Sequence, residues 1–406
     1  MRSAFHSSWF LVFVSIMSQH DSFPATLAIF CKVVDNYGDI GICWRLARQL
    51  RGEHRIAVTL WVDDLASFRR IWPAVAVDAD AQTVEGVLVR HWRGQDGEVG
   101  PGEVADIVIE FFGVDLPPGY IAAMAQCTPR PIWINYEGLS AEEWVEGCHA
   151  LPSMHPRLPL TKHFFFPGFT EKTGGLLRER DLLAERDAFQ ADPGAQAAFL
   201  AGLGVTGEEV AAFKTSLFCY PDAPVAPLFA AWRTGGRDVT CLVPEGVARE
   251  QVQDFLGAEA VAGAHATRGR LTVRVIPFMS QRDYDRLLWA CDFNFVRGED
   301  SWVRAQWAGR PFVWHIYRQD ENLHHVKLRA FLQKYAPGLT GLNEFSLRWN
   351  GARDPHMDEH ADWAQSWSSL QADLPGISQR NAAWQAQMLA NGDLVSNLLH
   401  FARSLR

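Results

Sequence analysis

The stretch LAIFCKVVDNYGDIGICWRLARQL, residues 27–50, indicates the fold class. It begins with an apolar run, residues 27–34, that is rich in strand-forming residues and predicts a buried β-strand. The following DNYGD, residues 35–39, has the composition of a turn, and apolar residues then recur at helical spacing up to Leu50. We expect Gly52 to end that helix. A strand, a tight turn and a helix in this order are typical of an α/β protein with a parallel sheet.

The same alternation continues along almost the whole chain. Further strands of a first series are predicted at residues 58–62, 87–92, 104–112 and 131–136. A second series is predicted at residues 216–220, 238–243, 271–276, 292–296 and 311–316. The stretch 184–210, rich in alanine, glycine and charge, lies between the two series and is interpreted as a connection. We therefore predict two doubly wound halves that face each other across a cleft, where ligands bind beyond the carboxyl ends of the strands.

Local signals predict where some helices start. Asp63 and Asp64 follow a strand and are interpreted as a helix cap, because no third ligand accompanies them to make a metal site. Ser140 and Glu143 have the spacing of a capping box. Leucines and a phenylalanine at positions 394, 398, 401 and 405 share one helical face, so a C-terminal helix is expected to dock on the rest of the chain.

Composition places the chain among ordinary globular proteins. Of its 406 residues, 48% are hydrophobic and 21% are charged, and the formal net charge of -9 argues against nucleic acid as the main partner. Seven cysteines occur without a CxxC pair, which fits a reducing compartment such as the cytoplasm. The adjacent His324 and His325 would point apart on a helix and make a poor metal pair, so we predict no metal site.

The N-terminus carries a signal of its own. Arg2 precedes an apolar stretch, residues 9–17, that resembles the core of a signal peptide, but no small-x-small cleavage site follows it. We interpret residues 1–24 as an N-terminal extension with little ordered structure, with Met17 as an alternative start. No later stretch is long and apolar enough to span a bilayer, so no membrane association is expected.

The first turn contains two acidic residues that are candidates for a site. Asp35 and Asp39 flank Gly38 between a strand and a helix, where the cleft is expected to open. The turn does not match the dinucleotide-binding G-x-G-x-x-G pattern. A single acid here is most simply an N-cap worth about 1 kcal/mol. Two acids in one glycine turn favour a functional site.

A second turn, VRGEDSW at residues 296–302, has the same place in the second half. Arg297 is a candidate for binding a diphosphate, because a guanidinium matches phosphate oxygens in a fork. The backbone amides at the helix start around Asp300 and Ser301 form an anion cradle. The alternative is that Asp300 or Ser301 serves only as the N-cap.

Weaker candidates lie at other strand ends of the second half. Phe278 precedes a helix cap at Ser280 and has the place to stack on a base, although an aromatic residue there also suits the core. Tyr220 ends a strand and has the place to meet a ribose or phosphate. The aromatic run FFFPGF, residues 164–169, fits either a cleft wall or the packing between the halves.

Three segments resemble one known family. They are IFCKVVDNYGDIGICWRLARQL at 29–50, PGFTEKTGGLLRERDL within 164–182, and VRGEDSWVRAQWAGRPFVWHIYRQDENLHHVK at 296–327. These long motifs are similar to the elongation factor P arginine rhamnosyltransferases (EarP). The likeness runs from about residue 26 through the second half and is weaker in the C-terminal helix.

The resemblance implies a GT-B fold of two Rossmann-like domains. It implies an acceptor domain at residues 25–185, a nucleotide-sugar donor domain at 210–375, and a last helix at 380–406 that crosses back to the first domain. It also implies inverting, metal-independent transfer of rhamnose from dTDP-β-L-rhamnose to an arginine of elongation factor P, which activates the factor. The family's essential acids fall on Asp35, Asp39 and Glu299. Its nucleotide contacts fall on Tyr220, Phe278, Gln281, Arg297, Asp300 and Ser301.

Such a reaction is consistent with these residue types. An arginine side chain is a poor nucleophile because its guanidinium is protonated, with a pKa above ~12. Carboxylates that face the guanidinium hold it and accept its proton as the C–N bond forms. Arg297 and helix-start amides stabilise a leaving diphosphate. The alternatives are another nucleotide-sugar enzyme of this fold, such as an epimerase or a transferase to a small acceptor, or a non-catalytic protein that binds a translation factor.

Overall fold

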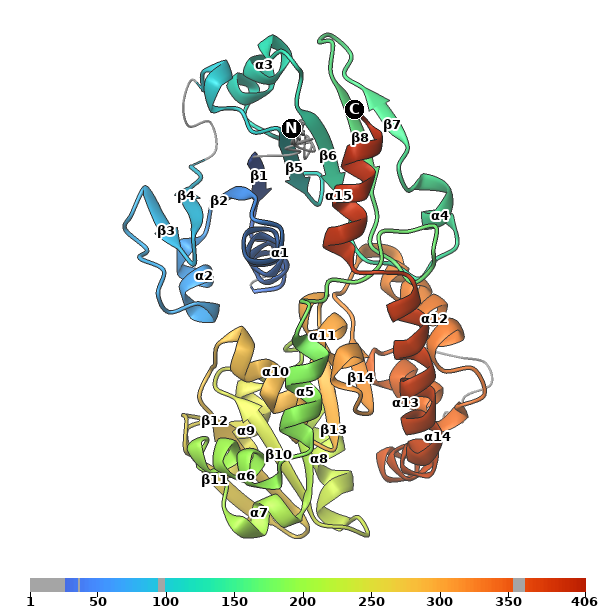
Figure 1. Ribbon diagram of the computed structural model, residues 1–406. Coiled ribbons are helices and arrows are strands. Elements are labelled where there is room, and N and C mark those ends of the chain that lie inside the picture. Colours follow the sequence, from blue (N-terminus) through green and yellow to red (C-terminus); the bar gives the residue numbers. More distant parts are fainter. Residues whose placement is uncertain (1–25, 36, 94–98, 353–361) are drawn as a thin grey trace, which may run out of the picture.

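The computed structural model describes residues 26–35, 37–93, 99–352 and 362–406. Its elements form two α/β halves, an N-terminal half built on strands β1–β8 and a C-terminal half built on strands β9–β14 (Figure 1). The predicted extension at residues 1–24 lies outside the described residues. Within the described ranges, no helix is both long enough and apolar enough to cross a membrane.

The N-terminal half contains an eight-stranded sheet in the order β3-β4-β2-β1-β5-β6-β8-β7. The inner strands are parallel, and the edge strands β3 and β7 pair antiparallel with their neighbours. The strands are β1 Thr26–Cys31, β2 Ala57–Val62, β3 Ala81–Val84, β4 Val87–His91, β5 Ile107–Phe111, β6 Ile132–Tyr136, β7 Pro152–Met154 and β8 Thr161–Phe165. The helices are α1 Gly38–His54, α2 Leu65–Ile71, α3 Pro118–Gln126 and α4 Trp144–Cys148, with a 3₁₀ turn at Pro101–Glu103.

The C-terminal half contains a six-stranded sheet in the order β11-β12-β10-β9-β13-β14, in which only the edge strand β11 is antiparallel. The strands are β9 Phe213–Leu217, β10 Val239–Pro244, β11 His265–Arg268, β12 Leu271–Ile276, β13 Phe293–Arg297 and β14 Phe312–His315. Its helices are α5 Leu182–Gln190, α6 Pro193–Gly202, α7 Gly207–Ala211, α8 Val225–Thr234, α9 Arg249–Leu256, α10 Gln281–Ala290, α11 Asp300–Ala308, α12 Leu323–Tyr335, α13 Thr340–Trp349 and α14 Trp363–Ala390, with a 3₁₀ turn at Asp320–Asn322. The last helix of the chain, α15 Leu394–Ser404, packs on the N-terminal half.

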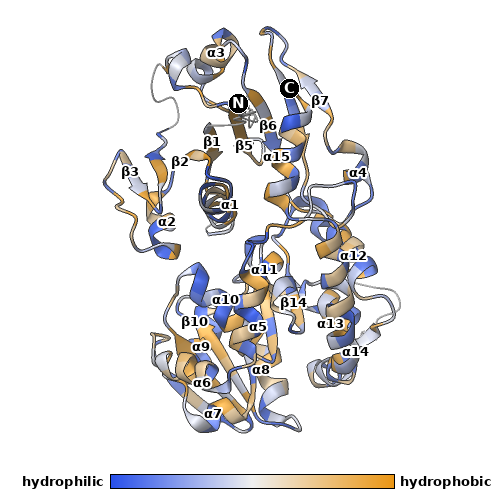
Figure 2. Ribbon diagram, in the orientation of Figure 1, coloured by the Kyte–Doolittle hydropathy of each residue, from blue (hydrophilic) through white to orange (hydrophobic). Residues whose placement is uncertain are grey.

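The central strand β1 shows why its apolar run forms a parallel sheet. Leu27 and Ile29 belong to the core that also contains α1, whereas Ala28 and Phe30 belong to a second core on the other face of the sheet. A strand buried on both faces needs apolar residues throughout rather than at alternate positions. Figure 2 shows hydrophobic residues concentrated in the strands of both sheets.

The chain returns to the N-terminal half at its end, as predicted. Helix α14 packs on the C-terminal half, where Trp367 contacts Trp232 and Phe295. Helix α15 then joins the core of the N-terminal half through buried side chains that include Leu394 and Leu398. The predicted helix at 380–406 is therefore the end of α14 followed by a separate helix, with a break around Gly392 (Figure 1).

Two local predictions are wrong and one is confirmed. Helix α1 continues past Gly52 to His54, and Arg55, whose backbone is left-handed, is its C-cap. A glycine inside a helix lowers stability by only about 1 kcal/mol, which is small beside the burial of most of this helix. The Ser140 hydroxyl bonds to Glu142 rather than forming a capping box with Glu143, and α4 starts only at Trp144. Asp64 does cap α2, since its carboxylate accepts bonds from the amides of residues 66 and 67.

The predicted connection at 184–210 is largely helical. It contains most of α5, all of α6 and the start of α7. Leu200 and Val205 share a core with residues of the second sheet, including Leu242 and Ile276. These helices therefore pack as part of the C-terminal half.

Candidate active site

The loops that follow β1 and β13 meet at the interface between the two halves. Both loops lie at the carboxyl ends of inner parallel strands, which is where doubly wound sheets bind ligands. Asp35, Asp39 and Glu299 line one cavity with a volume of about 610 Å³, which we call the acidic cavity. Its walls come from both halves, so neither half forms it alone.

Asp39 is buried and holds the loop that precedes its own helix. Its Oδ2 atom accepts hydrogen bonds from the backbone amides of Val34 (2.7 Å) and Asp35 (2.9 Å). The N-cap residue of α1 is Tyr37, which makes no side-chain cap bond, so the interpretation of Asp39 as a simple helix cap is wrong. Burial raises the pKa of Asp39, while the two amide bonds act in the opposite direction.

Asp35 reaches across the interface to the C-terminal half. Its Oδ2 atom accepts a hydrogen bond from the Tyr220 hydroxyl (2.7 Å). Its Oδ1 atom is buried, and within the described part of the chain no donor reaches it. Burial raises the pKa of Asp35, opposed by the Tyr220 bond and by the charge of Arg297. A buried carboxylate oxygen without a donor is costly and is suited to receive one from a ligand.

A glycine makes this contact across the interface sterically possible. Gly298 has a left-handed backbone (φ 60°), and a Cβ atom there would lie 2.8 Å from Asp35 Oδ2 and 3.0 Å from the Tyr220 hydroxyl. Any side chain would therefore both strain the backbone and push the two groups apart.

Glu299 ties the C-terminal half to a loop of the N-terminal half. Its Oε2 atom accepts a hydrogen bond from the backbone amide of Leu139 (2.8 Å). Burial raises the pKa of Glu299 to about 7, although Lys327 and the Leu139 amide oppose the rise and Asp39 adds to it. Near neutral pH this carboxyl group is therefore poised between its two protonation states.

A second, narrower pocket adjoins the acidic cavity, and we call it the donor pocket after the predicted nucleotide contacts that line it. It shares Asp35 and Gly38 with the acidic cavity. Five of the six predicted nucleotide contacts line it: Phe278, Gln281, Arg297, Asp300 and Ser301. The sixth, Tyr220, lies at its border, where the Arg297 guanidinium packs 4.8 Å from the ring centroid.

Arg297 is held rigidly at this pocket. Its guanidinium lies 4.4 Å from the centroid of the Phe218 ring, and its Nη1 atom donates to the Cys219 carbonyl (3.0 Å). The Ser301 hydroxyl accepts from the Arg297 amide (2.9 Å) and donates to the Arg297 carbonyl, so it stabilises the turn. The N-cap of α11 is Glu299 without a side-chain cap bond, so the interpretation of Asp300 or Ser301 as the cap is wrong.

Phe278 and Gln281 face the N-terminal half. The Phe278 ring packs against Tyr37 (centroids 4.9 Å apart) and under the Arg70 guanidinium (5.2 Å). Gln281 Nε2 donates to the Gly41 carbonyl (2.9 Å), while its buried Oε1 atom has no donor among the residues that the structure describes. Gln281 therefore keeps an unused hydrogen-bond acceptor at the wall of the donor pocket.

Known proteins match this chain over nearly its whole length. The family model for elongation-factor P (EF-P) rhamnosyltransferase EarP matches residues 27–403. The chain belongs to the EarP family. A protein-arginine rhamnosyltransferase of Pseudomonas putida is 49% identical and aligns over 94% of this chain and 99% of that protein. A protein of the same name from Pseudomonas aeruginosa is 46% identical, with 93% and 98% covered.

Solved structures agree with the family. An EarP structure from work on EarP-mediated arginine glycosylation of translation elongation factor EF-P is 37% identical, with a TM-score of 0.64 over 94% of this chain and 99% of that one. A glycosyltransferase from Rickettsia africae shares the fold alone, with a TM-score of 0.51 at 10% identity over 94% and 97% of the two chains. The chain is therefore a glycosyltransferase with the GT-B fold, and both predictions are confirmed.

Three residues of this EarP site were not singled out from the sequence. Phe218 packs on Arg297, Lys327 faces Glu299, and Arg45 holds Asp300 through a bond described below. The sequence could have indicated Phe218, because it stands two residues before Tyr220 at a strand end, and residues at this spacing in an extended segment point to the same side. The sequence could also have indicated Arg45, because it is a charged residue between apolar neighbours of α1. Nothing in the sequence indicated Lys327, since a lysine on a helix is typical of an ordinary surface position.

Proposed function

We propose that this member of the EarP family transfers rhamnose from dTDP-β-L-rhamnose to an arginine of EF-P, with inversion at the anomeric carbon and without a metal ion. The observation that carries the proposal is the junction of the acidic cavity, which suits a guanidinium, with the donor pocket, which suits a nucleotide diphosphate. Asp35 lines both spaces, so the two substrates would meet beside it.

The acidic cavity has the groups that the acceptor half of the reaction requires. The unpaired Asp35 Oδ1 atom would accept a hydrogen bond from the guanidinium and orient it. As a guanidinium nitrogen bonds to the anomeric carbon, the bond from that carbon to the diphosphate oxygen breaks. We assign Asp39 as the base that accepts the proton lost from the nitrogen.

The donor pocket has the groups that the leaving diphosphate requires. The Arg297 guanidinium is a fixed positive charge at the pocket wall, and the first amides of α11 have no intrahelical acceptors. Both would stabilise the negative charge that develops on the diphosphate. No group of three or more potential metal ligands occurs within the described residues.

The rim of the acidic cavity favours a protein over a small acceptor. Trp144 (53% exposed) and Phe112 (37%) stand on the side of the N-terminal half, and Tyr317 (47%) and Leu323 (55%) stand on the side of the C-terminal half. Large exposed apolar side chains gathered around one opening are typical of a surface that contacts another protein. An enzyme for a small sugar acceptor needs no such rim.

The direct test is incubation of EF-P with this protein and dTDP-rhamnose, followed by intact-mass and fragment-mass measurement. We expect one added deoxyhexose on a single arginine of EF-P. Hydrolysis of the donor, or a sugar found only on small acceptors, with EF-P unmodified would overturn the proposal in favour of another nucleotide-sugar enzyme. EF-P that binds the protein but stays unmodified would favour the non-catalytic alternative.

Metal independence is tested in the same assay. We expect the rate of EF-P modification in excess EDTA to equal the rate without it, because Arg297 and the start of α11 supply the positive charge that a cation would otherwise supply. A rate that collapses in EDTA and recovers on addition of Mg²⁺ or Mn²⁺ would contradict this part of the proposal.

The pH profile tests the role of Glu299. With a pKa of about 7, this carboxyl group is largely neutral below that pH and cannot balance the acceptor guanidinium. We therefore expect kcat/KM to rise with pH through an inflection near 7, and Glu299→Gln to lower the plateau and abolish that inflection. Glu142→Gln, which removes another carboxylate of the same cavity, should keep it. An unchanged inflection in Glu299→Gln would assign it to another group.

The same pKa shift predicts how stability depends on pH. The folded protein holds the Glu299 proton more tightly than the unfolded chain does, since the pKa rises from 4.5 to about 7 on folding. The contribution of this group to the free energy of unfolding therefore falls as pH rises from about 4.5 towards 7. The melting temperature of Glu299→Gln relative to wild type should accordingly increase from about pH 5 to about pH 8.

A further inference from the structure

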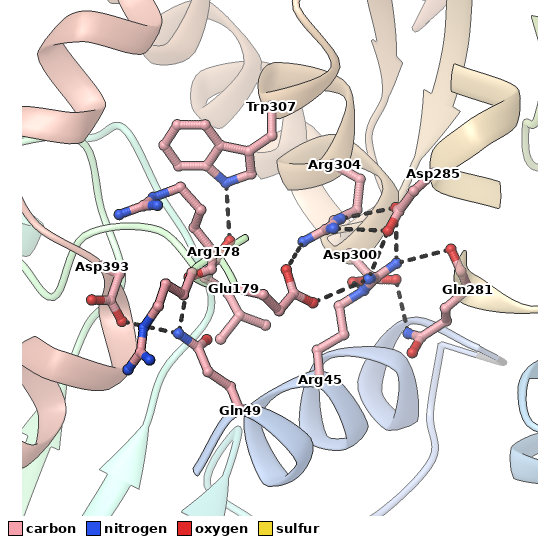
Figure 3. Close-up of polar contacts among 12 residues, drawn as sticks. Arg45, Gln49, Arg178, Glu179, Gln281, Asp285, Asp300, Arg304, Trp307 and Asp393 are labelled. Atoms are coloured by element: carbon pink, nitrogen blue, oxygen red, sulfur yellow. Dashed lines mark hydrogen bonds and ion pairs between the residues drawn. The ribbon is translucent and has the colours of Figure 1, made fainter. Parts of the chain in front are cut away.

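Arg45 projects from the middle of α1, in the N-terminal half, into the C-terminal half. Its side chain is 2% exposed, and its Nε atom donates to Asp300 Oδ1 (2.9 Å). Its Nη1 and Nη2 atoms donate to the two carboxylate oxygens of Asp285 (3.0 and 3.1 Å). Figure 3 shows this guanidinium surrounded by acidic side chains, all of them from outside α1.

Helix α1 can approach this closely because Gly41 has no side chain. A Cβ atom at Gly41 would lie 3.1 Å from Gln281 Nε2 and 3.2 Å from Asp300 Oδ2. Gln281 Nε2 donates to the Gly41 carbonyl and also to Asp300 Oδ2 (3.2 Å). The backbone of α1 therefore contacts the two donor-pocket residues directly, one helical turn before Arg45.

The charges around Arg45 are nearly balanced. Arg304 of α11 lies beside it and donates to both oxygens of Asp285, at 2.9 and 2.7 Å. Glu179 accepts from both arginines, and these two charges hold its pKa at about 2 in spite of burial. Asp300 accepts from Arg45 but has no ion pair with Arg304. Arg45 is thus the cation bonded directly to Asp300, and the charge of Arg304 lowers the pKa of Asp300 to a lesser extent, against the rise caused by burial.

This matters because Asp300 is the first residue of α11, where the diphosphate is proposed to bind. An unbalanced carboxylate at this point would repel a diphosphate and cancel the attraction of the helix-start amides. With its carboxylate bound to Arg45 and Gln281, Asp300 can contribute its amide without that repulsion.

We propose that Arg45 is a positioning residue for the donor: it neutralises and orients Asp300 and so completes the donor pocket from the opposite half. This inference rests on the proposed function, because it requires a diphosphate at the start of α11. It makes binding of the donor depend on the two halves being in contact, since α1 belongs to the N-terminal half and α11 to the C-terminal half.

The test is calorimetric titration of dTDP into the wild type, Arg45→Met and the double variant Arg45→Met/Asp300→Asn, with the melting temperature of each. We expect Arg45→Met to bind dTDP weaker by roughly tenfold to a hundredfold, because Asp300 becomes an unbalanced charge. The double variant should recover a large part of the affinity, since the amide that replaces the carboxylate carries no charge. A role in stability alone would predict no such recovery.

The matched control is Arg274→Met. Arg274 is 4% exposed, is paired with Glu209 (2.7 Å), and lies in the C-terminal half without lining either pocket. The Arg274→Met variant should have a lower melting temperature than the wild type but the same affinity for dTDP. If Arg45→Met does not fold, Arg45→Gln also removes the charge while its side-chain amide can still donate a hydrogen bond, and it should show a comparable loss of affinity.

The outcomes distinguish the role of Arg45 from the identity of the proposed donor. Wild-type affinity for dTDP in folded Arg45→Met, or in Arg45→Gln if Met is not tolerated, overturns the inference and leaves the proposed function intact. Failure of Asp300→Asn to restore affinity overturns the charge-balancing role. Absence of dTDP binding in the wild type overturns the proposed donor, and the inference falls with it.

Discussion

Asp39→Asn is expected to lower the rate of EF-P rhamnosylation by roughly 10²–10⁴-fold, the usual share of general acid–base catalysis. Asparagine keeps a carbonyl oxygen in the place of Oδ2, so it can still accept from the amides of Val34 and Asp35 and hold the loop. What it loses is the ability to accept a proton. The melting temperature and the affinity for dTDP should therefore stay close to those of the wild type.

The control for this experiment is Asp63→Asn. Asp63 Oδ1 accepts a hydrogen bond from the Val33 amide (2.8 Å), so it anchors the same loop, but it does not line the acidic cavity. If Asp39 acts only as a loop anchor, the two variants should behave alike and both stay active. Near wild-type turnover of Asp39→Asn would rule out the base and direct attention to Asp35 or Glu299.

Arg297→Ala is expected to remove most of the stabilisation that dTDP gives the wild type in a thermal-shift assay. The rings of Phe218 and Tyr220 and the Cys219 carbonyl hold the guanidinium before any ligand arrives, so little entropy is lost when it binds a diphosphate. We expect an affinity loss of roughly 10–10²-fold, with a comparable loss in rate because the same charge stabilises the leaving group.

Arg310→Ala is the matched control for Arg297→Ala. Arg310 is half-buried in the same half and also donates to a backbone carbonyl, that of Trp289 (3.3 Å), but it lines neither pocket. Its removal should leave the dTDP shift unchanged. An equal shift in wild type and Arg297→Ala would exclude Arg297 from the donor site.

Helix-cap patterns in the sequence predicted the structure correctly where the capping residue bonds to residues close to it in the chain. Asp64 caps α2 as predicted because its donors are two and three residues away. The capping box at Ser140 failed although its spacing was right. The loop there is bound by Glu299 through the Leu139 amide, and one cap worth about 1 kcal/mol does not outweigh that contact.

The sequence by itself determined the fold class and the two loops that carry the chemistry. A fully apolar run such as the one in β1 is stable only between two helical layers, so parallel α/β halves followed from residue type. The sequence also predicted the site at Asp35, Asp39 and the Arg297 turn. Charged residues directly after a buried parallel strand lie at the edge of the sheet where ligands bind, and they do not contribute to the apolar core.

Only the tertiary structure decided which of these groups act together. Asp35 bonds to Tyr220, 185 residues away, and Arg45 bonds to Asp300, 255 residues away. No periodicity relates residues at such separations, because their distance depends on how the two halves dock and not on local backbone preference. The docking also buries the carboxylates together, which raises the pKa of Asp35, Asp39 and Glu299. The residue types were therefore set by the sequence, but their protonation and partners were set by the interface between the halves.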